Sequence, residues 1–222
     1  MCHRIYKTGF EVIKYYALSI IILTMNMVAA NASDLKEITV LAFGDSLTAG
    51  YGLKTEDGFT HQLEQKLKNH GIQVNVINAG LSGDTTSGGL SRLEWVLASA
   101  NGGQPDLVIL ELGGNDALRG VAPKIARDNL DNMLAILTKA RLKILLTGML
   151  APPNMGPDYA QNFNPIYADL SKKYQTFLYP FFLDGVAGNP SLNQDDGMHP
   201  NPEGVRIIVD NITPQILNIL QK

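Results

Sequence analysis

Cysteine is almost absent from this sequence of 222 residues. The single cysteine, Cys2, lies at the N-terminus, in a segment that is predicted below to be removed. The remaining chain would therefore have no disulfide, no thiolate metal site and no cysteine nucleophile. Any nucleophilic chemistry would need a side-chain oxygen or a lysine nitrogen.

Histidine and strong charge are also scarce. Three histidines follow the N-terminal segment, His61, His70 and His199, and no HxH or HxxxH spacing occurs. A catalytic zinc site needs three converging protein ligands, so a metal hydrolase is disfavoured. The formal net charge of −3 becomes −5 when the three cations and one anion of residues 1–32 are removed, and no basic run is present. A mildly acidic chain of this kind does not suit nucleic-acid binding.

The N-terminus has the pattern of an export signal. A positively charged start precedes an uncharged apolar stretch over residues 15–30, and Ala30-Asn31-Ala32 offers a small-x-small cleavage site. The alternative is an uncleaved membrane anchor, although the stretch is short and Asn26 interrupts it. We predict a signal peptide over residues 1–32, one domain over residues 33–222, and an exported protein that is periplasmic or secreted.

Apolar stretches recur along this domain at regular intervals. We predict strands at 38–43, 74–78, 106–112, 142–149 and 176–181, the last being the weakest. We predict helices at 59–71, 87–100, 124–140, 159–173 and from Asn201 onward, with Pro214 expected to interrupt or bend the last. Because nearly all-apolar strands alternate with helices, the pattern predicts an α/β fold with a parallel sheet between two helix layers. Ligands of such sheets bind beyond the carboxyl ends of the strands.

Ser46 follows the first predicted strand, in the stretch LAFGDSLTAGYG over residues 41–52. This serine has three interpretations: a nucleophile, a helix cap, or part of a phosphate-binding turn. The phosphate interpretation is disfavoured because neither G-x-x-x-x-G-K-[ST] nor G-x-G-x-x-G occurs, and Lys54 is the nearest cation. A serine nucleophile needs an adjacent base, most often an imidazole that a third group holds in place.

His199 is the strongest candidate for that base. It lies in a turn just after Asp195 and Asp196, whereas the other two histidines lie in a predicted helix. Asp196 is three residues away, so one loop can bring its carboxylate to His199 Nδ1 and leave Nε2 facing Ser46. We interpret Asp195 as a turn or capping residue. The alternative for His199 is a structural histidine packed beneath the last helix.

Three groups are candidate donors to a developing oxyanion. The first is the backbone N–H of Ser46, which begins a helix-like segment. The second is Gly83, because a glycine allows the backbone to approach a ligand closely. The third is the side chain of Asn115, whose alternative role is an Asx turn that supports its own loop.

Four blocks of residues now stand in a recognisable order: Gly44-Asp45-Ser46-Leu47, Gly83, Gly113-Gly114-Asn115-Asp116 and Asp196-Gly197-Met198-His199. In order and spacing they resemble the four blocks of SGNH (GDSL-type) hydrolases. The whole of residues 33–222 is similar to the exported bacterial branch of that family, which includes thioesterases, lysophospholipases and arylesterases. A single GDSL motif would be weak support for this resemblance, whereas four blocks in order, each after a predicted strand, are strong support for it.

The resemblance implies a three-layer α/β/α fold with a flavodoxin-like, five-stranded parallel sheet, and no metal or cofactor. It implies that Ser46 is the nucleophile, His199 the general base and then acid, and Asp196 the residue that orients His199. The oxyanion hole would consist of the Ser46 and Gly83 N–H groups and the Asn115 side chain. Substrates would be small esters, thioesters or single-acyl-chain lipids. The alternatives are a carbohydrate O-acetylesterase of the same fold, and a binding protein with a decayed site, against which the intact blocks argue.

The substrate groove is the least defined part of the prediction. No long insertion resembles a lid, so we expect an open site with residues 150–163 as one wall. Leu150, Met155 and Phe163 are candidate groove residues, although such side chains more often pack in the core. We expect a monomer with no nucleic-acid partner and no membrane span after signal cleavage.

Overall fold

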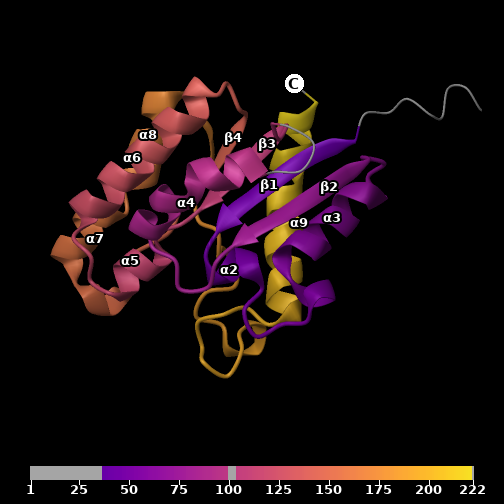
Figure 1. The fold of residues 1–222 in the computed structure, drawn as a ribbon. Helices are drawn as coiled ribbons and strands as arrows, with labels where there is room; N and C mark the ends of the chain where they lie inside the picture. Colours follow the sequence, from indigo (N-terminus) through magenta and orange to yellow (C-terminus); the bar gives the residue numbers. More distant parts are fainter. Residues whose placement is uncertain (1–36, 100–103, 222) are drawn as a thin grey trace, which may run out of the picture. The chain divides into compact units, whose positions relative to one another are not determined.

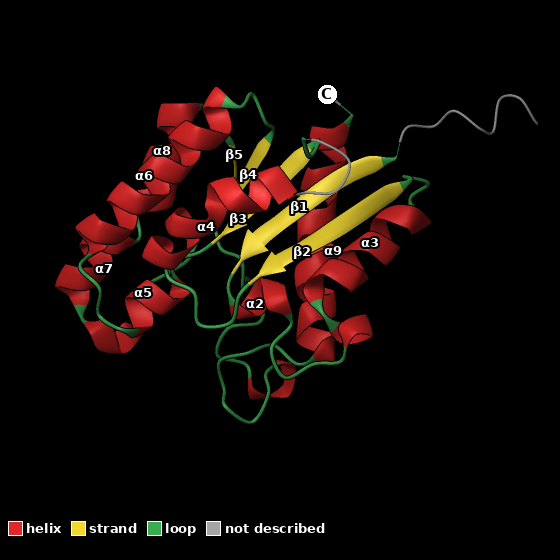
Figure 2. Cartoon of the chain, in the orientation of Figure 1, coloured by secondary structure: helices red, strands yellow, loops and turns green. Residues whose placement is uncertain are grey.

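The computed structural model describes residues 37–99 and 104–221, so the predicted signal peptide lies outside the described residues. The described chain contains a parallel sheet with the strand order β2-β1-β3-β4-β5 (Figure 1; Figure 2). The strands are β1 (Ile38–Gly44), β2 (Val74–Gly80), β3 (Leu107–Glu111), β4 (Ile144–Thr147) and β5 (Phe177–Tyr179). This order is that of flavodoxin-like sheets, so the predicted fold class is confirmed.

Helices cover both faces of the sheet. In Figure 1, α3 and α9 pack together on one face, while α4, α6 and α8 lie on the other. The helices are α2 (Ser46–Ala49), α3 (Phe59–Asn69), α4 (Thr86–Ser99), α5 (Gly114–Leu118), α6 (Pro123–Lys139), α7 (Pro157–Phe163), α8 (Ile166–Tyr174) and α9 (Pro202–Leu220). Asn201 caps α9 and Pro202 takes its first position, as the sequence predicts. Among the described residues no helix is long and apolar enough to cross a membrane.

The register of the sheet brings the turns after the central strands to one edge. Gly44 at the end of β1 pairs with Gly80 of β2 on one side and with Glu111 of β3 on the other. All residues of β3 and β4 are buried, as expected for central parallel strands covered by helices on both faces. The order of strands reverses at β1, so the turn that follows β1 lies at the switch point where ligands of such sheets bind.

The structure contradicts one prediction about helices and one half of another. The predicted helix over 159–173 is two helices, α7 and α8, because Pro165 has no N–H to continue the hydrogen-bond ladder. Pro214, in contrast, does not interrupt α9, which continues to Leu220. The helix buries a long apolar stripe against the sheet, and this burial offsets the one backbone hydrogen bond that Pro214 cannot make.

Candidate active site

Ser46 begins α2, a single helical turn that follows β1 directly. Asp45 caps the turn, because its Oδ1 accepts the Leu47 N–H at 3.0 Å. Gly50 ends it in a left-handed conformation with φ of 80°, and its N–H donates to the Ser46 carbonyl at 3.1 Å. The turn therefore holds Ser46 at the carboxyl edge of the sheet, with 9% of the residue exposed.

His199 reaches Ser46 from the loop that precedes α9. The imidazole Nε2 lies 2.9 Å from Ser46 Oγ, and Nδ1 lies 2.6 Å from Asp196 Oδ2. The Tyr51 ring packs against the imidazole, with ring centroids 4.6 Å apart and planes tilted by 39°. The structure thus brings together the three residues of the predicted triad, and it is Asp196 rather than Asp195 whose carboxylate contacts the imidazole.

The loop that carries Asp196 and His199 is closed by backbone contacts. The Gln194 N–H donates to the His199 carbonyl at 2.7 Å. Asn193 and Pro200 form an isolated antiparallel bridge beside it. The carboxylate and the imidazole are therefore held on one short, closed segment of chain.

Asp196 is held as a carboxylate by hydrogen bonds. Its Oδ1 accepts the N–H groups of His199 at 3.0 Å and Met198 at 2.9 Å, while Oδ2 faces the imidazole. These backbone N–H groups and the ring lower the pKa of Asp196 from 3.8 to about 2. Because this carboxylate is an acceptor only, the imidazole Nδ1 donates its proton to it, which leaves Nε2 as the acceptor toward Ser46.

Gly83 lies on the loop after β2, and Asn115 lies in the first turn of α5, the short helix that follows β3. Gly83 has φ of 78°, which favours glycine, and its carbonyl accepts from Arg119 Nη2 at 2.9 Å. The Asn115 Nδ2 donates to Asp45 Oδ2 at 2.9 Å. Asp45 thus connects the amide of Asn115 to the turn of Ser46, which places this predicted oxyanion donor beside the predicted nucleophile.

Arg92 on α4 ties the ends of β1 and β2 together, and the sequence analysis missed it. Its Nη2 and Nη1 donate to the carbonyls of Gly44 and Ala79, each at 2.9 Å. Its Nε forms an ion pair with Asp84 at 2.7 Å, and its guanidinium lies over the Phe43 ring, 4.0 Å from the centroid. An arginine in a predicted helix is usually a charge on the solvent-exposed face, so the sequence alone does not indicate that Arg92 joins the two strands.

Asp116 connects the first turn of α5, which follows β3, to the start of α4. Its Oδ2 accepts the Thr86 N–H at 2.8 Å and its Oδ1 accepts the Thr86 hydroxyl at 2.6 Å. Both residues are completely buried. The motif that contains Asn115 therefore also fixes the helix that follows the loop of Gly83, a role that the sequence analysis did not assign.

The predicted wall over residues 150–163 has three different environments. Leu150 is exposed and Met155 is half-buried, so both can face a ligand. Phe163 is completely buried and stacks on Tyr159, with centroids 5.7 Å apart. The assignment of Phe163 to a substrate groove was wrong, because α7 directs its ring into the core.

Four exposed apolar residues lie close in sequence to predicted site residues or in contact with one, and we call them the apolar rim. Its members are each 50–55% exposed and lie within three residues of a predicted site residue or in contact with one: Tyr51, Leu81, Leu118 and Met198. Single exposed apolar residues are ordinary on protein surfaces. Their concentration on the loops that carry the triad and the candidate oxyanion donors is less ordinary and suggests contact with an apolar ligand.

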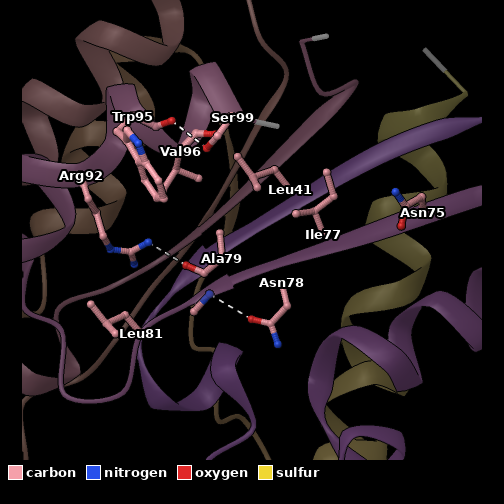
Figure 3. A pocket seen from close by; sticks show the side chains of 11 residues that line it. Leu41, Asn75, Ile77, Asn78, Ala79, Leu81, Arg92, Trp95, Val96 and Ser99 are labelled. Atoms are coloured by element: carbon pink, nitrogen blue, oxygen red, sulfur yellow. Dashed lines mark hydrogen bonds between the residues drawn. The ribbon is translucent and has the colours of Figure 1, made fainter. Parts of the chain in front are cut away.

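A separate pocket lies between β2 and α4 (Figure 3). Trp95 and Val96 of α4 face Ile77 and Asn78 of β2 across it, and Arg92 reaches from its wall to the Ala79 carbonyl. The residues that line it do not include those of the triad. Within residues 37–99 and 104–221, no cluster of three or more His, Cys, Asp or Glu side chains is arranged to hold a metal ion.

A family model for the GDSL-like Lipase/Acylhydrolase family matches residues 42–207, and the chain belongs to this family. The chain is 40% identical over 182 residues to esterase TesA of Pseudomonas aeruginosa, which covers 82% of this chain and 89% of that protein. It is 36% identical over 199 residues to thioesterase 1/protease 1/lysophospholipase L1 of Escherichia coli, covering 90% of this chain and 89% of that one. Among solved structures, the SGNH-hydrolase family esterase AlinE4 is 46% identical, with a TM-score of 0.71 over 82% of this chain and 96% of that chain. The resemblance inferred from the four blocks is confirmed.

Proposed function

We propose that this protein is a serine esterase that hydrolyses carboxylic esters and thioesters. The observation that carries the proposal is the chain of contacts from Asp196 through His199 to Ser46, at 2.6 and 2.9 Å. A serine hydroxyl bonded to an imidazole that a carboxylate orients is the arrangement that activates a serine for acyl transfer. Similarity to an esterase and to a thioesterase over most of the chain supports the same reaction.

The reaction proceeds through an acyl-serine. Ser46 Oγ attacks the carbonyl carbon while His199 Nε2 accepts the hydroxyl proton. The bond to the leaving alcohol or thiol then breaks, and Nε2 returns the proton to the leaving group. Water next attacks the acyl carbon and passes a proton to Nε2, which delivers it to Ser46 Oγ as the acid departs. Asp196 stays ionised throughout and stabilises the imidazolium that forms at both steps.

The oxyanion of each tetrahedral intermediate would be stabilised by three N–H donors. The Ser46 N–H lies at the start of α2, where backbone N–H groups have no partner within the helix. The Asn115 amide nitrogen carries two hydrogens, and its bond to Asp45 uses one and orients the other. The Gly83 N–H is the third donor, and Arg119 holds the same residue by donating to the Gly83 carbonyl, which belongs to the following peptide.

The apolar rim indicates the substrate class. Tyr51, Leu81, Leu118 and Met198 expose apolar surface on the segments that carry the predicted site residues, and Leu150 and Met155 expose more on the predicted wall over residues 150–163. Such a surface favours an ester with an aryl group or a single acyl chain over a carbohydrate acetyl ester.

We also infer that residues 1–32 direct export and are removed. The mass of the protein recovered from the producing cell should then correspond to a start near Ser33, and a full-length protein in the membrane fraction would instead support an anchor.

Hydrolysis of a p-nitrophenyl ester series from acetate to palmitate tests the proposal. Wild type should hydrolyse the series with an optimum above acetate, and Ser46→Ala and His199→Ala should each lose roughly 10⁴-fold or more in kcat. A Ser46→Ala variant with full activity would remove Ser46 from the mechanism. Activity confined to acetate would support the deacetylase alternative.

A further inference from the structure

Glu111 lies directly beneath the turn that carries Ser46. It is the last residue of β3, pairs with Gly44 of β1 and Thr147 of β4 in the register of the sheet, and is completely buried. A carboxyl group in this position is unusual, because the rest of β3 is apolar. The reaction described above does not use it.

The carboxyl of Glu111 contacts the chain on both sides of Ser46. Its Oε2 accepts the Asp45 N–H at 3.2 Å and the Thr48 hydroxyl at 2.8 Å. The Glu111 carboxyl also approaches residue 44 so closely that only glycine fits there, because a Cβ would lie 2.5 Å from Oε2. One oxygen of Glu111 therefore holds the residue before the serine and the residue two positions after it.

The other oxygen of Glu111 has no partner. Oε1 is buried and accepts no hydrogen bond, and the charge that acts on the group is that of the Asp45 carboxylate. Burial, and after it the charge of Asp45, raise the pKa of Glu111 well above its ordinary value. Burial raises the pKa of Asp45 as well, but less than that of Glu111. Asp45 accepts N–H bonds on both oxygens, from Leu47 and Asn115, whereas Glu111 accepts on one oxygen only, so we place the negative charge of the pair on Asp45. Leaving one neutral O–H without an acceptor costs far less than burying a second unpaired charge.

We propose that Glu111 is a positioning residue which, as a neutral carboxylic acid, fixes the turn of Ser46 by accepting the Asp45 N–H and the Thr48 hydroxyl on Oε2. The inference rests on the proposed function, because it assigns Glu111 to the placement of the nucleophile. Glu111 acts on the site indirectly, through two parts of the chain. Glu111 holds the backbone that aims Ser46 Oγ at His199, and it holds the peptide of Asp45, whose side chain orients Asn115.

The test compares Glu111→Gln and Glu111→Leu with Thr147→Val as a matched control. Glutamine keeps an accepting oxygen and no charge, so its kcat should stay within about threefold of wild type. Leucine removes the acceptor, so kcat should fall by about 10–100-fold with KM within about threefold, because the turn shifts without changing substrate contacts. Thr147 is buried on the neighbouring strand and bonds the Leu110 carbonyl, not the turn, so its variant should lose stability and keep kcat.

Covalent labelling separates this inference from the proposed function. A p-nitrophenyl alkylphosphonate should label Ser46 at similar rates in wild type and in Glu111→Gln. In Glu111→Leu the labelling rate should fall by about the same factor as kcat. An unlabelled Ser46 in wild type would refute the proposed function itself. Equal labelling and kcat in the leucine variant, with only a lower Tm, would reduce Glu111 to a structural residue. A glutamine variant as impaired as the leucine variant would show that the ionised form is required. Either of the last two results overturns the inference.

Discussion

The contact between Asp196 and His199 gives the sharpest prediction, for the substitution Asp196→Asn. In wild type, Oδ1 accepts two backbone N–H groups and Oδ2 faces the imidazole Nδ1 at 2.6 Å. Asparagine would keep its one oxygen on the two backbone donors, so its NH₂ group would face Nδ1. Because an NH₂ group donates, Nδ1 would have to accept and the ring proton would move to Nε2, 2.9 Å from Ser46 Oγ. A protonated Nε2 of a neutral imidazole cannot take the serine proton.

The structure sets the size of this effect. Two of the three hydrogen bonds of Asp196 survive the substitution, so the loop keeps its shape and the Tm should change little. The wrong tautomer of the base should lower kcat by about 10³–10⁴, where the upper value is the loss of roughly 10⁴ known for this change in a serine protease triad. In free energy this is a loss of roughly 4–5.5 kcal/mol of transition-state stabilisation.

The assay is p-nitrophenyl butyrate hydrolysis at neutral pH, with a thermal unfolding curve for each protein. Asp195→Asn is the matched control, because Asp195 is adjacent in sequence and makes no contact with the imidazole, and it should keep wild-type kcat within about twofold. Since the pKa of Asp196 is lowered to about 2, its carboxylate in wild type is charged at all assay pH values above about 4. The asparagine amide does not ionise, so raising the pH cannot supply the variant with this charge. If Asp196→Asn kept more than a tenth of wild-type kcat, the orienting role of Asp196 would be refuted.

Three further predictions follow from other contacts of the site. Asn115→Ala removes a candidate oxyanion donor and should lower kcat about 10²–10³-fold with KM little changed, measured on the same ester. Tyr51→Ala removes the ring packed 4.6 Å from the His199 imidazole and should lower kcat/KM about 2–10-fold, whereas Tyr51→Phe should not. Arg92→Met leaves the Asp84 charge unpaired, so it should lower the free energy of unfolding by about 3–5 kcal/mol and the Tm by roughly 6–20 °C. The exposed ion pair between Arg127 and Asp169 gives the control. Arg127→Met should lower the free energy of unfolding, measured by calorimetry, by about 1 kcal/mol or less.

The triad could be predicted from sequence because parallel sheets impose one geometric rule. Ser46, Gly83 and Asn115 each follow a strand, and the carboxyl ends of neighbouring parallel strands lie at the same edge, so residues far apart in sequence must meet there. Asp196 and His199 are three residues apart, so their contact needs only a tight loop. Residue type and chain position were therefore sufficient for this part of the site.

The parts that the sequence analysis missed depend on burial, which a single sequence does not reveal. Phe163 could equally line a groove or fill the core, and its place was decided by the direction of a helix that Pro165 cuts short. Arg92 looks like a surface charge until its three partners are seen. Glu111 did carry a signal, because a carboxylate at the end of an otherwise apolar strand must find a partner or stay neutral. Pro214 shows the opposite case, in which a strong local signal yields to the burial of its helix.

The closed loop that holds Asp196 and His199 divides the site into two parts of different local stability. Ser46 in α2 and Glu111 at the end of β3 are buried at the carboxyl edge of the sheet. The loop, in contrast, is largely exposed, and a bridge between Asn193 and Pro200 and a few backbone bonds hold it closed. Segments with few buried contacts open at a lower free energy than core strands. Opening of this loop would remove the proposed base and its carboxylate in one event, while Ser46 stays folded. We therefore expect heat to abolish esterase activity at a temperature below that at which the sheet melts by circular dichroism, and we expect activity to return on cooling when the loop closes again.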